Sequence, residues 1–139
     1  MANKTLLQPD RPLRISLIIL SMVCLGIIFI GQHFDYSSLL SAELNSNQRF
    51  IFNRTIRFLL NDNLMLLMIF AIFYDKKYVK FGFAVELFGF FFLLIPYFLL
   101  RFEFNINHTY ISFIHRLIIN PTLMLLLIPA IYIQRIKKV

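Results

Sequence analysis

Charged residues are scarce in this sequence, and their scarcity excludes an ordinary soluble domain. They account for 15% of the 139 residues, whereas hydrophobic residues account for 59%. A typical soluble domain carries about 25% charged residues, and a water-soluble chain of this length could not bury so much apolar surface in one core. The chain is also too short to hold a soluble domain beside a membrane domain. We therefore predict a single integral membrane domain over residues 1–139.

Cysteine is nearly absent as well. Cys24 is the only one, so an internal disulfide is impossible. The sequence contains no HExxH, GxSxG, P-loop or CxxC motif and no spacing typical of a metal site. A thiol peptidase built from Cys24 and His115 is disfavoured, because Cys24 falls near the midplane of the membrane and His115 at its outer boundary. We expect no enzymatic activity, no cofactor and no metal.

Long apolar runs are what the sequence has in abundance. A helix rises about 1.5 Å per residue, so about 20 apolar residues cross a hydrocarbon core of about 30 Å. Four blocks reach or approach this length, and they cover residues 13–31, 55–74, 79–100 and 117–134. The sequence therefore predicts an all-α fold, a four-helix transmembrane bundle.

The connectors between these blocks differ in length and character. In the first, the weakly amphipathic run from Leu39 to Leu44 indicates a short helix at the outer interface. Asn53 is a candidate N-cap for the second helix. The second connector is so short that helices two and three must form an antiparallel hairpin. The third, residues 101–116, mixes polar and aromatic residues and is predicted as a connector.

The net charge of +7 is distributed unevenly. The lysines occupy three places that four crossings would put on one side of the membrane, and they are Lys4, Lys76, Lys77, Lys80, Lys137 and Lys138. The opposite loops contain arginine but no lysine, so the positive-inside rule places both termini in the cytoplasm. The basic charge is then an orientation signal with contacts to anionic lipid headgroups. We expect membrane lipids as partners and no nucleic acid.

Polar residues gather at the outer ends of the second and fourth blocks. The candidate outer cluster consists of Arg54, Arg57, Asn61 and Asp62 in the second block and His115, Arg116 and Asn120 in the fourth. Polar groups at membrane depth are costly unless they are paired, so we expect Asp62 to face Arg116 or Arg57. Two interpretations remain open: a docking or substrate-contact surface, and a structural ion pair that fixes helix register.

Glu86 is a second candidate, on the third block about 10 Å from its cytoplasmic end. One interpretation is the proton-coupled carboxylate of a transporter. The other is a glutamate that hydrogen-bonds a neighbouring helix, and the expectation that no second carboxylate lies at its depth favours this one. Pro96, Pro121 and Pro129 predict kinks, with Asn120–Pro121 as the alternative start of the regular part of the fourth helix.

Two stretches resemble a known family. They are Arg57–Asn61 leading on to Ala71–Phe81, and Arg116–Gln134. Over roughly residues 54–138 the chain is similar to the small membrane proteins associated with exosortase F in flavobacteria and relatives. The family-like positions are Arg57, Asn61, Arg116, Pro121 and Pro129, and no catalytic role is carried over with them. The first outer loop lacks the acidic and aromatic run usual in that family.

The resemblance implies a setting for the chain. Exosortases are transpeptidase-like membrane proteases that process C-terminal sorting tails at the outer face of the bacterial inner membrane. We accordingly predict a non-enzymatic accessory protein of such a sorting system, which docks to the protease or to its tailed substrate. The alternatives are a small transporter or channel subunit built by homo-oligomerisation, and a purely structural membrane scaffold.

Overall fold

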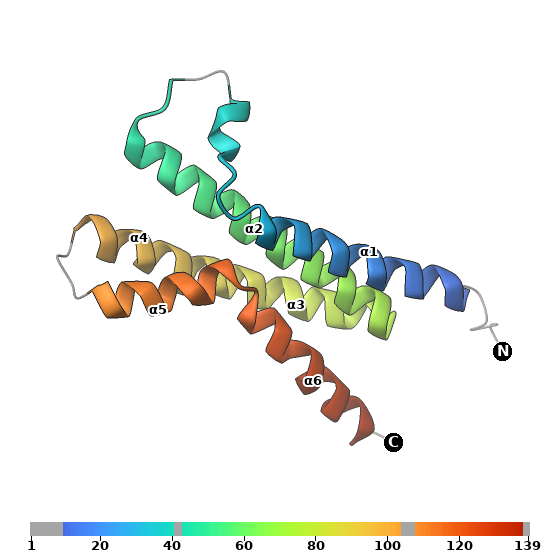
Figure 1. Cartoon of the computed structure of the whole chain (residues 1–139). Coiled ribbons are helices and arrows are strands. Elements are labelled where there is room, and N and C mark those ends of the chain that lie inside the picture. The colour runs from blue at the N-terminus through green and yellow to red at the C-terminus, as the bar shows by residue number, and fades with distance from the viewer. Residues whose placement is uncertain (1–9, 41–42, 104–107, 138–139) are drawn as a thin grey trace.

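The described part of the chain is entirely helical. The computed structural model describes residues 10–40, 43–103 and 108–137, and no strand occurs in these ranges. The elements are α1 (Arg11–Ile30), the 3₁₀ turn η1 (Tyr36–Leu39), α2 (Ser46–Phe73), α3 (Lys76–Gly89), the π-helical turn η2 (Phe90–Leu94), α4 (Ile95–Phe102), α5 (His108–Ile119) and α6 (Thr122–Ile136). Figure 1 shows them in chain order. The expected all-α fold is confirmed for these residues.

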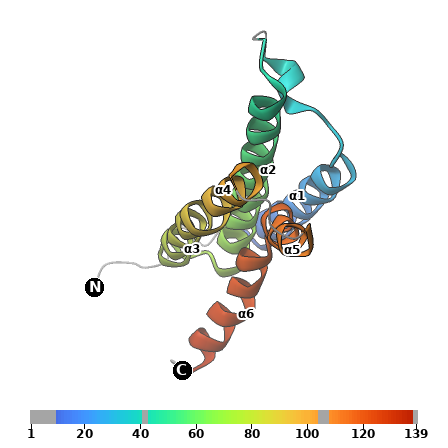
Figure 2. The same ribbon diagram turned by 90° about the vertical axis from the view of Figure 1, so that its left-hand side faces the viewer.

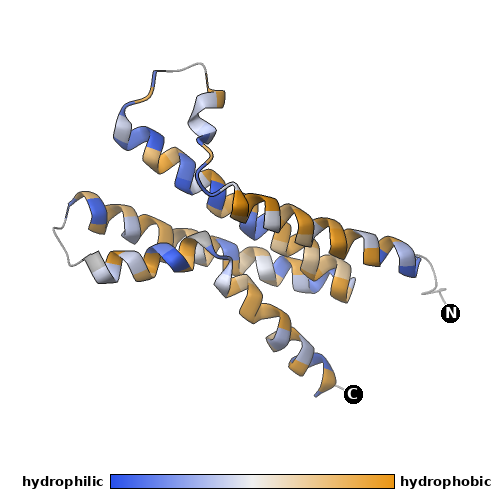
Figure 3. Cartoon of the chain, in the orientation of Figure 1, coloured by the Kyte–Doolittle hydropathy of each residue, from blue (hydrophilic) through white to orange (hydrophobic). Residues whose placement is uncertain are grey.

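Several helices are long and apolar enough to cross a membrane. Three unbroken ones qualify among the described residues: Arg11–Ile30, Ser46–Phe73 and Lys76–Phe102. A fourth qualifies if α5 and α6, which meet at an angle of 56°, are taken as one broken span. Apolar residues cover the surfaces of these helices along most of their length (Figure 3).

The second helix occupies the centre of the arrangement. It packs along α1, forms a hairpin with α3, and contacts both α5 and α6. Figure 2 shows α2 with α1 on one side and the rod formed by α3, η2 and α4 on the other. The start of α1, the α2–α3 turn and the end of α6 lie at one end of the molecule, while η1, the end of α4 and the start of α5 lie at the other (Figure 1).

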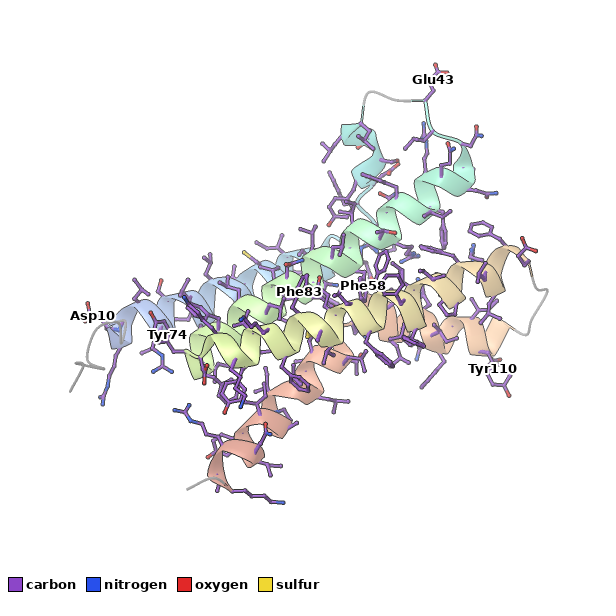
Figure 4. The ribbon with its side chains drawn as sticks, turned by 180° about the vertical axis from the view of Figure 1, so that it is seen from behind. Asp10, Glu43, Phe58, Tyr74, Phe83 and Tyr110 are labelled. Atoms are coloured by element: carbon purple, nitrogen blue, oxygen red, sulfur yellow. The ribbon has the colours of Figure 1, made fainter. Side chains whose placement is uncertain are left out.

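Apolar side chains form two buried clusters along α2. The first joins α2 to α6 and contains Met65, Ile69, Met124 and Ile131, each at most 2% exposed. The second joins α2 to η2, α4 and α5 and contains Phe58, Leu94, Tyr97 and Ile118. Phe58 lies where α2 meets the α3–α4 rod (Figure 4). The buried residues of α2 recur at spacings of three and four and so form continuous apolar faces. Other helices pack against these faces on two sides of α2.

Two glycines on α3 allow it to approach α2 closely. Gly82 and Gly89 are both buried. A Cβ added at Gly82 would lie 2.5 Å from Cδ2 of Leu66, and one added at Gly89 would lie 3.3 Å from Cζ of Phe58. Small residues at a helix interface in a membrane let backbones come together where the hydrophobic effect does not drive association.

An arginine fastens α1 to the end of α2. The Nε of Arg14 donates to the backbone carbonyl of Ala71 at 3.0 Å, and its Nη2 donates to the carbonyl of Ile72. The last carbonyls of a helix have no partner within the helix, and a cation there is favoured by the helix dipole. Arg14 is thus a structural link between the first turn of α1 and the last turn of α2.

The second helix begins nine residues earlier than predicted. It starts at Ser46 rather than near Thr55, with Asn45 as its N-cap residue. The side chain of Gln48 accepts a hydrogen bond from the Asn45 amide at 3.0 Å, which is one half of a capping box. Asn53, the expected N-cap, lies inside the helix. The short helix expected in the first connector is the 3₁₀ turn Tyr36–Leu39, upstream of the run that predicted it, and residues 41–42 lie outside the described ranges.

The fourth apolar block is not one straight helix. Much of the predicted connector 101–116 belongs to helices, since α4 ends at Phe102 and α5 begins at His108. The chain then breaks at Asn120–Pro121 before α6 begins at Thr122. Pro121 lacks an N–H and so cannot continue the hydrogen bonding of α5. The alternative that Pro121 begins the regular part of this helix is confirmed; residues 104–107 lie outside the described ranges.

The close contact at Gly82 can be tested by filling it. Gly82→Leu is expected to destabilise the fold by about 1–3 kcal/mol, as overpacking commonly does, because the new side chain must push Leu66 aside and separate α3 from α2. The measurement is unfolding of the purified protein by sodium dodecyl sulfate in a mild detergent. Gly26→Leu is the matched control, since a Cβ at Gly26 meets no atom within 4 Å. Equal stability of the Gly82 variant and the wild type would contradict the contact.

Candidate functional site

Arg54 and Arg57, in the N-terminal half of α2, contact different neighbours. Arg57 points into a cavity of about 290 Å³ between α1, α2 and the break that joins α5 to α6. Arg54 lies instead against aromatic side chains at the α4 and α5 side of the bundle. The shared face expected for Arg54, Arg57 and Asn61 therefore divides into two.

The cavity has a polar part and an apolar wall. Its polar lining residues are Gln32 from α1's C-terminal end, Arg57 and Asn61 from α2, and Asn120 from the helix break. The apolar wall includes Leu25, Phe29, Met65 and Leu125. Three members of the predicted outer cluster, Arg57, Asn61 and Asn120, are thus brought together. Among the described residues that line the cavity, Arg57 is the only charged one.

Arg57 is deeply buried and incompletely bonded. Its side chain is 5% exposed, and its Nε atom has no hydrogen-bond partner. No Asp or Glu of the described residues forms an ion pair with it. The ring of Tyr36 covers it from the loop side, with the guanidinium carbon 5.9 Å from the ring centroid. A buried donor without an acceptor costs about 1–3 kcal/mol, and a buried charge without a counter-charge costs more.

Three side chains hold η1 against α2, and we call them the loop clip: Asp35, Ser37 and Asn53. Oδ1 of Asp35 accepts hydrogen bonds from the Ser37 amide at 2.9 Å, from the Ser37 hydroxyl, and from Nδ2 of Asn53 at 2.7 Å. The Ser37 amide also donates to Oδ1 of Asn53 at 3.1 Å. The hydrogen bond from the Ser37 side chain and that from Asn53 lower the pKa of Asp35 below its ordinary value. The clip fixes Tyr36 next to Arg57.

An arginine–aromatic cluster lies on the other side of α2, made of Phe50, Arg54, Tyr97, Arg101 and His115. The guanidinium carbons of Arg101 and Arg54 lie 4.3 and 5.3 Å from the Phe50 ring centroid. Phe50 stacks on Tyr97, which stacks on His115, with centroid separations of 6.3 and 5.9 Å. Arginines favour aromatic faces through their cation–π attraction. The cluster is therefore cationic and is stabilised without an acidic partner.

Arg116 lies apart from both groups. It is exposed and shares a shallow hollow with Thr109, Ser112 and Phe113, at the spacing of one face of α5. It still acts electrostatically on the neighbouring His115 ring, as do Arg54, Arg57 and Arg101. Four arginines therefore lie near the His115 ring.

The expected ion pair of Asp62 is not present. Asp62 is 5% exposed and forms no ion pair with Arg57 or Arg116; the charged side chain that acts on it is Glu86. The expectation that Glu86 has no carboxylate at its depth is therefore wrong, because the hairpin of α2 and α3 turns both carboxyl groups inward. Nδ2 of Asn63 donates to Oε1 of Glu86 at 3.2 Å, while Oε2 of Glu86 is buried without a partner.

Several residues at these sites are ones that sequence patterns did not assign to a site. Tyr36 and Gln32 contribute to the cavity or its cover, as does Asn53, which the sequence indicated only as an N-cap, and Tyr97 and Arg101 contribute to the arginine–aromatic cluster. One signal was available: Asn53, Arg57 and Asn61 follow one another at spacings of four, which places them on one face of a helix. No group of three potential metal ligands occurs among the described residues, and Cys24 is half-buried there.

The chain was compared with known proteins. No protein-family model matches it, and neither the curated proteins nor the solved structures include a match. The resemblance to the exosortase-associated family therefore stays a prediction, and the site's chemistry has to be argued from its own residues.

The loop clip predicts a pH dependence. Because the pKa of Asp35 is lowered in the folded protein, the clip is fully formed above the ordinary aspartate range and is lost as the pH falls through the folded value. The measurement is hydrogen exchange at the Ser37 amide across a pH series. Asp35→Asn, which cannot titrate, should show no such step. Loss of protection while the pH is still above the ordinary aspartate range would contradict the clip.

Proposed function

We propose that the chain is an integral membrane protein that crosses the bilayer four times, with both termini in the cytoplasm. The helices that are long and apolar enough support this, with α5 and α6 together forming the fourth crossing. The position of the lysines supports the orientation. The described lysines lie at the end of the molecule that Asp10 and Tyr74 mark, and Glu43 and Tyr110 mark the opposite end (Figure 4). The positive-inside rule assigns the lysine-bearing end to the cytoplasm. A cysteine at Lys77 in a Cys24→Ala background tests it: labelling by a membrane-impermeant maleimide from outside the cell would contradict the orientation.

Within this setting the chain acts as a non-enzymatic accessory protein of an exosortase-type sorting system in a bacterial inner membrane. The observation that carries the proposal is the arginine-rich outer end. Arg54 and Arg101 lie on aromatic rings, Arg116 is exposed, and no described Asp or Glu forms an ion pair with any of them. Such a surface attracts an acidic patch or a carboxylate on a partner protein. The resemblance to exosortase-associated proteins supports the choice of partner: the protease or its tailed substrate.

Co-purification tests this docking surface. Tagged protein in mild detergent is expected to retain an exosortase or a tailed substrate from its native membrane. Arg101→Met and Arg116→Met, both exposed positions, are each expected to weaken retention about fivefold, which corresponds to about 1 kcal/mol for one exposed charge pair. Arg135→Met, an exposed arginine at the opposite end, is the control and is expected to retain the partner. Recovery of the wild type without either partner would count against the proposal.

The inward-facing carboxyl groups favour a second candidate, a small oligomeric transporter or channel subunit. Asp62 and Glu86 lie on facing helices, and Oε2 of Glu86 is buried without a partner. Intramembrane carboxyl groups commonly mark proton or cation pathways. In this case, ion flux into proteoliposomes should be abolished by Glu86→Gln and by Asp62→Asn, but not by Arg116→Met. The absence of flux under any ion gradient would remove this candidate, and a loss of stability alone would indicate a structural scaffold.

A further inference from the structure

The cavity between α1, α2 and the α5–α6 break contains an unusual combination of groups. Arg57 is more than nine-tenths buried, its Nε atom is enclosed without an acceptor, and it is the only charged residue among the described residues that line the cavity. A guanidinium carries five N–H donors and no acceptor. A guanidinium in the wall of a cavity that holds no counter-charge among these residues is suited to an anion that enters from outside the chain.

The remaining polar groups of the cavity suit the same anion. Asn61, Asn120 and Gln32 each carry an amide that can donate to an oxyanion, and they come from three different elements. The position of the cavity decides where the anion comes from. Arg14 marks the cytoplasmic end of α2 at Ala71, and Arg57 lies 14 residues before it, or about 21 Å along the helix. In a hydrocarbon core of about 30 Å this puts Arg57 about 9 Å from the outer boundary.

The apolar wall of the cavity indicates that the ligand has an apolar part as well as an anionic group. Leu25 and Phe29 from α1, Met65 from α2 and Leu125 from α6 form its apolar surface. A volume of about 290 Å³ is at the small end for a ligand pocket. It accommodates a headgroup phosphate and the first part of one acyl chain, while the rest of the lipid remains in the bilayer. A free inorganic anion would leave the apolar wall unused.

We propose that this cavity binds the phosphate of an anionic phospholipid from the outer leaflet. Arg57 supplies the charge, Asn120 and Gln32 supply further donors, and one acyl chain lies along the apolar wall. Tyr36, held by the loop clip, covers the guanidinium and excludes water from the outer side. The proposal rests on the membrane topology given above, but not on the identity of any protein partner.

Lipid retention by the full-length protein tests the proposal. The protein is purified in a neutral detergent, offered phosphatidylglycerol or phosphatidylcholine, and analysed by native mass spectrometry. The wild type is expected to retain one phosphatidylglycerol with at least about tenfold preference over phosphatidylcholine, in line with a charge-assisted contact. Arg57→Met, which keeps an unbranched apolar side chain but removes the guanidinium, is expected to lose about tenfold in phosphatidylglycerol affinity. The proposal is overturned if this variant binds like the wild type.

A second variant guards against a folding failure at Arg57. Gly26 lines the cavity, and a Cβ there meets no atom within 4 Å, so Gly26→Leu fills the cavity while all charges stay in place. It is expected to reduce phosphatidylglycerol retention as strongly as Arg57→Met. Arg49→Met, an exposed arginine on the same helix, is expected to change it less than twofold. Unchanged retention in Gly26→Leu would place any bound lipid elsewhere and would overturn the assignment.

A competition experiment distinguishes binding of the lipid from binding of a free anion. Inorganic phosphate at millimolar concentration is expected not to displace phosphatidylglycerol, because it cannot use the apolar wall. Displacement would overturn the lipid assignment in favour of a free phosphate. Co-purification of the protein partner is followed in the same Gly26→Leu variant and is expected to persist. Loss of the lipid with retention of the protein partner would support the lipid site independently of the docking proposal. Retention of the lipid with loss of the partner would overturn the lipid assignment and leave the docking proposal to be judged separately.

Discussion

Enclosure of α2 by the other helices is the constraint on which the rest of the structure depends. Half of its apolar stretch is buried within the protein, compared with 6% for α1 and 22% for Lys76–Phe102. A polar side chain facing lipid is costly, but one facing another helix can find a partner or a cavity. Of these three spans α2 is the most enclosed, and it carries the interior polar residues Arg57, Asn61 and Asp62, while the interior Glu86 of α3 accepts a hydrogen bond from Asn63 of α2. The close contact at Gly82 and Gly89 completes the enclosure on the α3 side.

Charges of like sign are grouped in this protein and not paired. Arginines gather at the end where α2 begins, whereas Asp62 and Glu86 are buried deeper in the bundle on neighbouring helices, within reach of each other's charge. A buried ion pair would have satisfied both groups within the chain and contributed only modestly to stability. The separation leaves Arg57 Nε and Glu86 Oε2 without partners. Each of these two atoms is a hydrogen-bonding group that a bound lipid, protein or ion can satisfy.

The length and polarity of the apolar blocks were enough to predict helices and an all-α fold. They did not predict the start of α2, because the many polar residues of Ser46–Asn53 are typical of a loop. This segment is helical because Phe50 stacks on Tyr97 and because Asn53 donates a hydrogen bond to Asp35. For the same reason α5 was mistaken for a connector. The rotation of α2 and α3 about their axes depends on packing at Gly82, so Asp62 was assigned to the wrong partner. The grouping of Arg57, Asn61 and Asn120 was predicted correctly, since all three follow from helix spacing and shared depth.

The unequal lengths of the helices make the two faces of the protein different in height. α1 has 20 residues, about the thickness of the hydrocarbon core, whereas α2 has 28 and rises about 42 Å. Arg14 binds the last turn of α2, and a short turn joins α2 to α3, so these helices are aligned at that end. The surplus of about 12 Å therefore lies at the opposite end, where α2 begins. There the first turns of α2 extend beyond the end of α1 and form a raised platform.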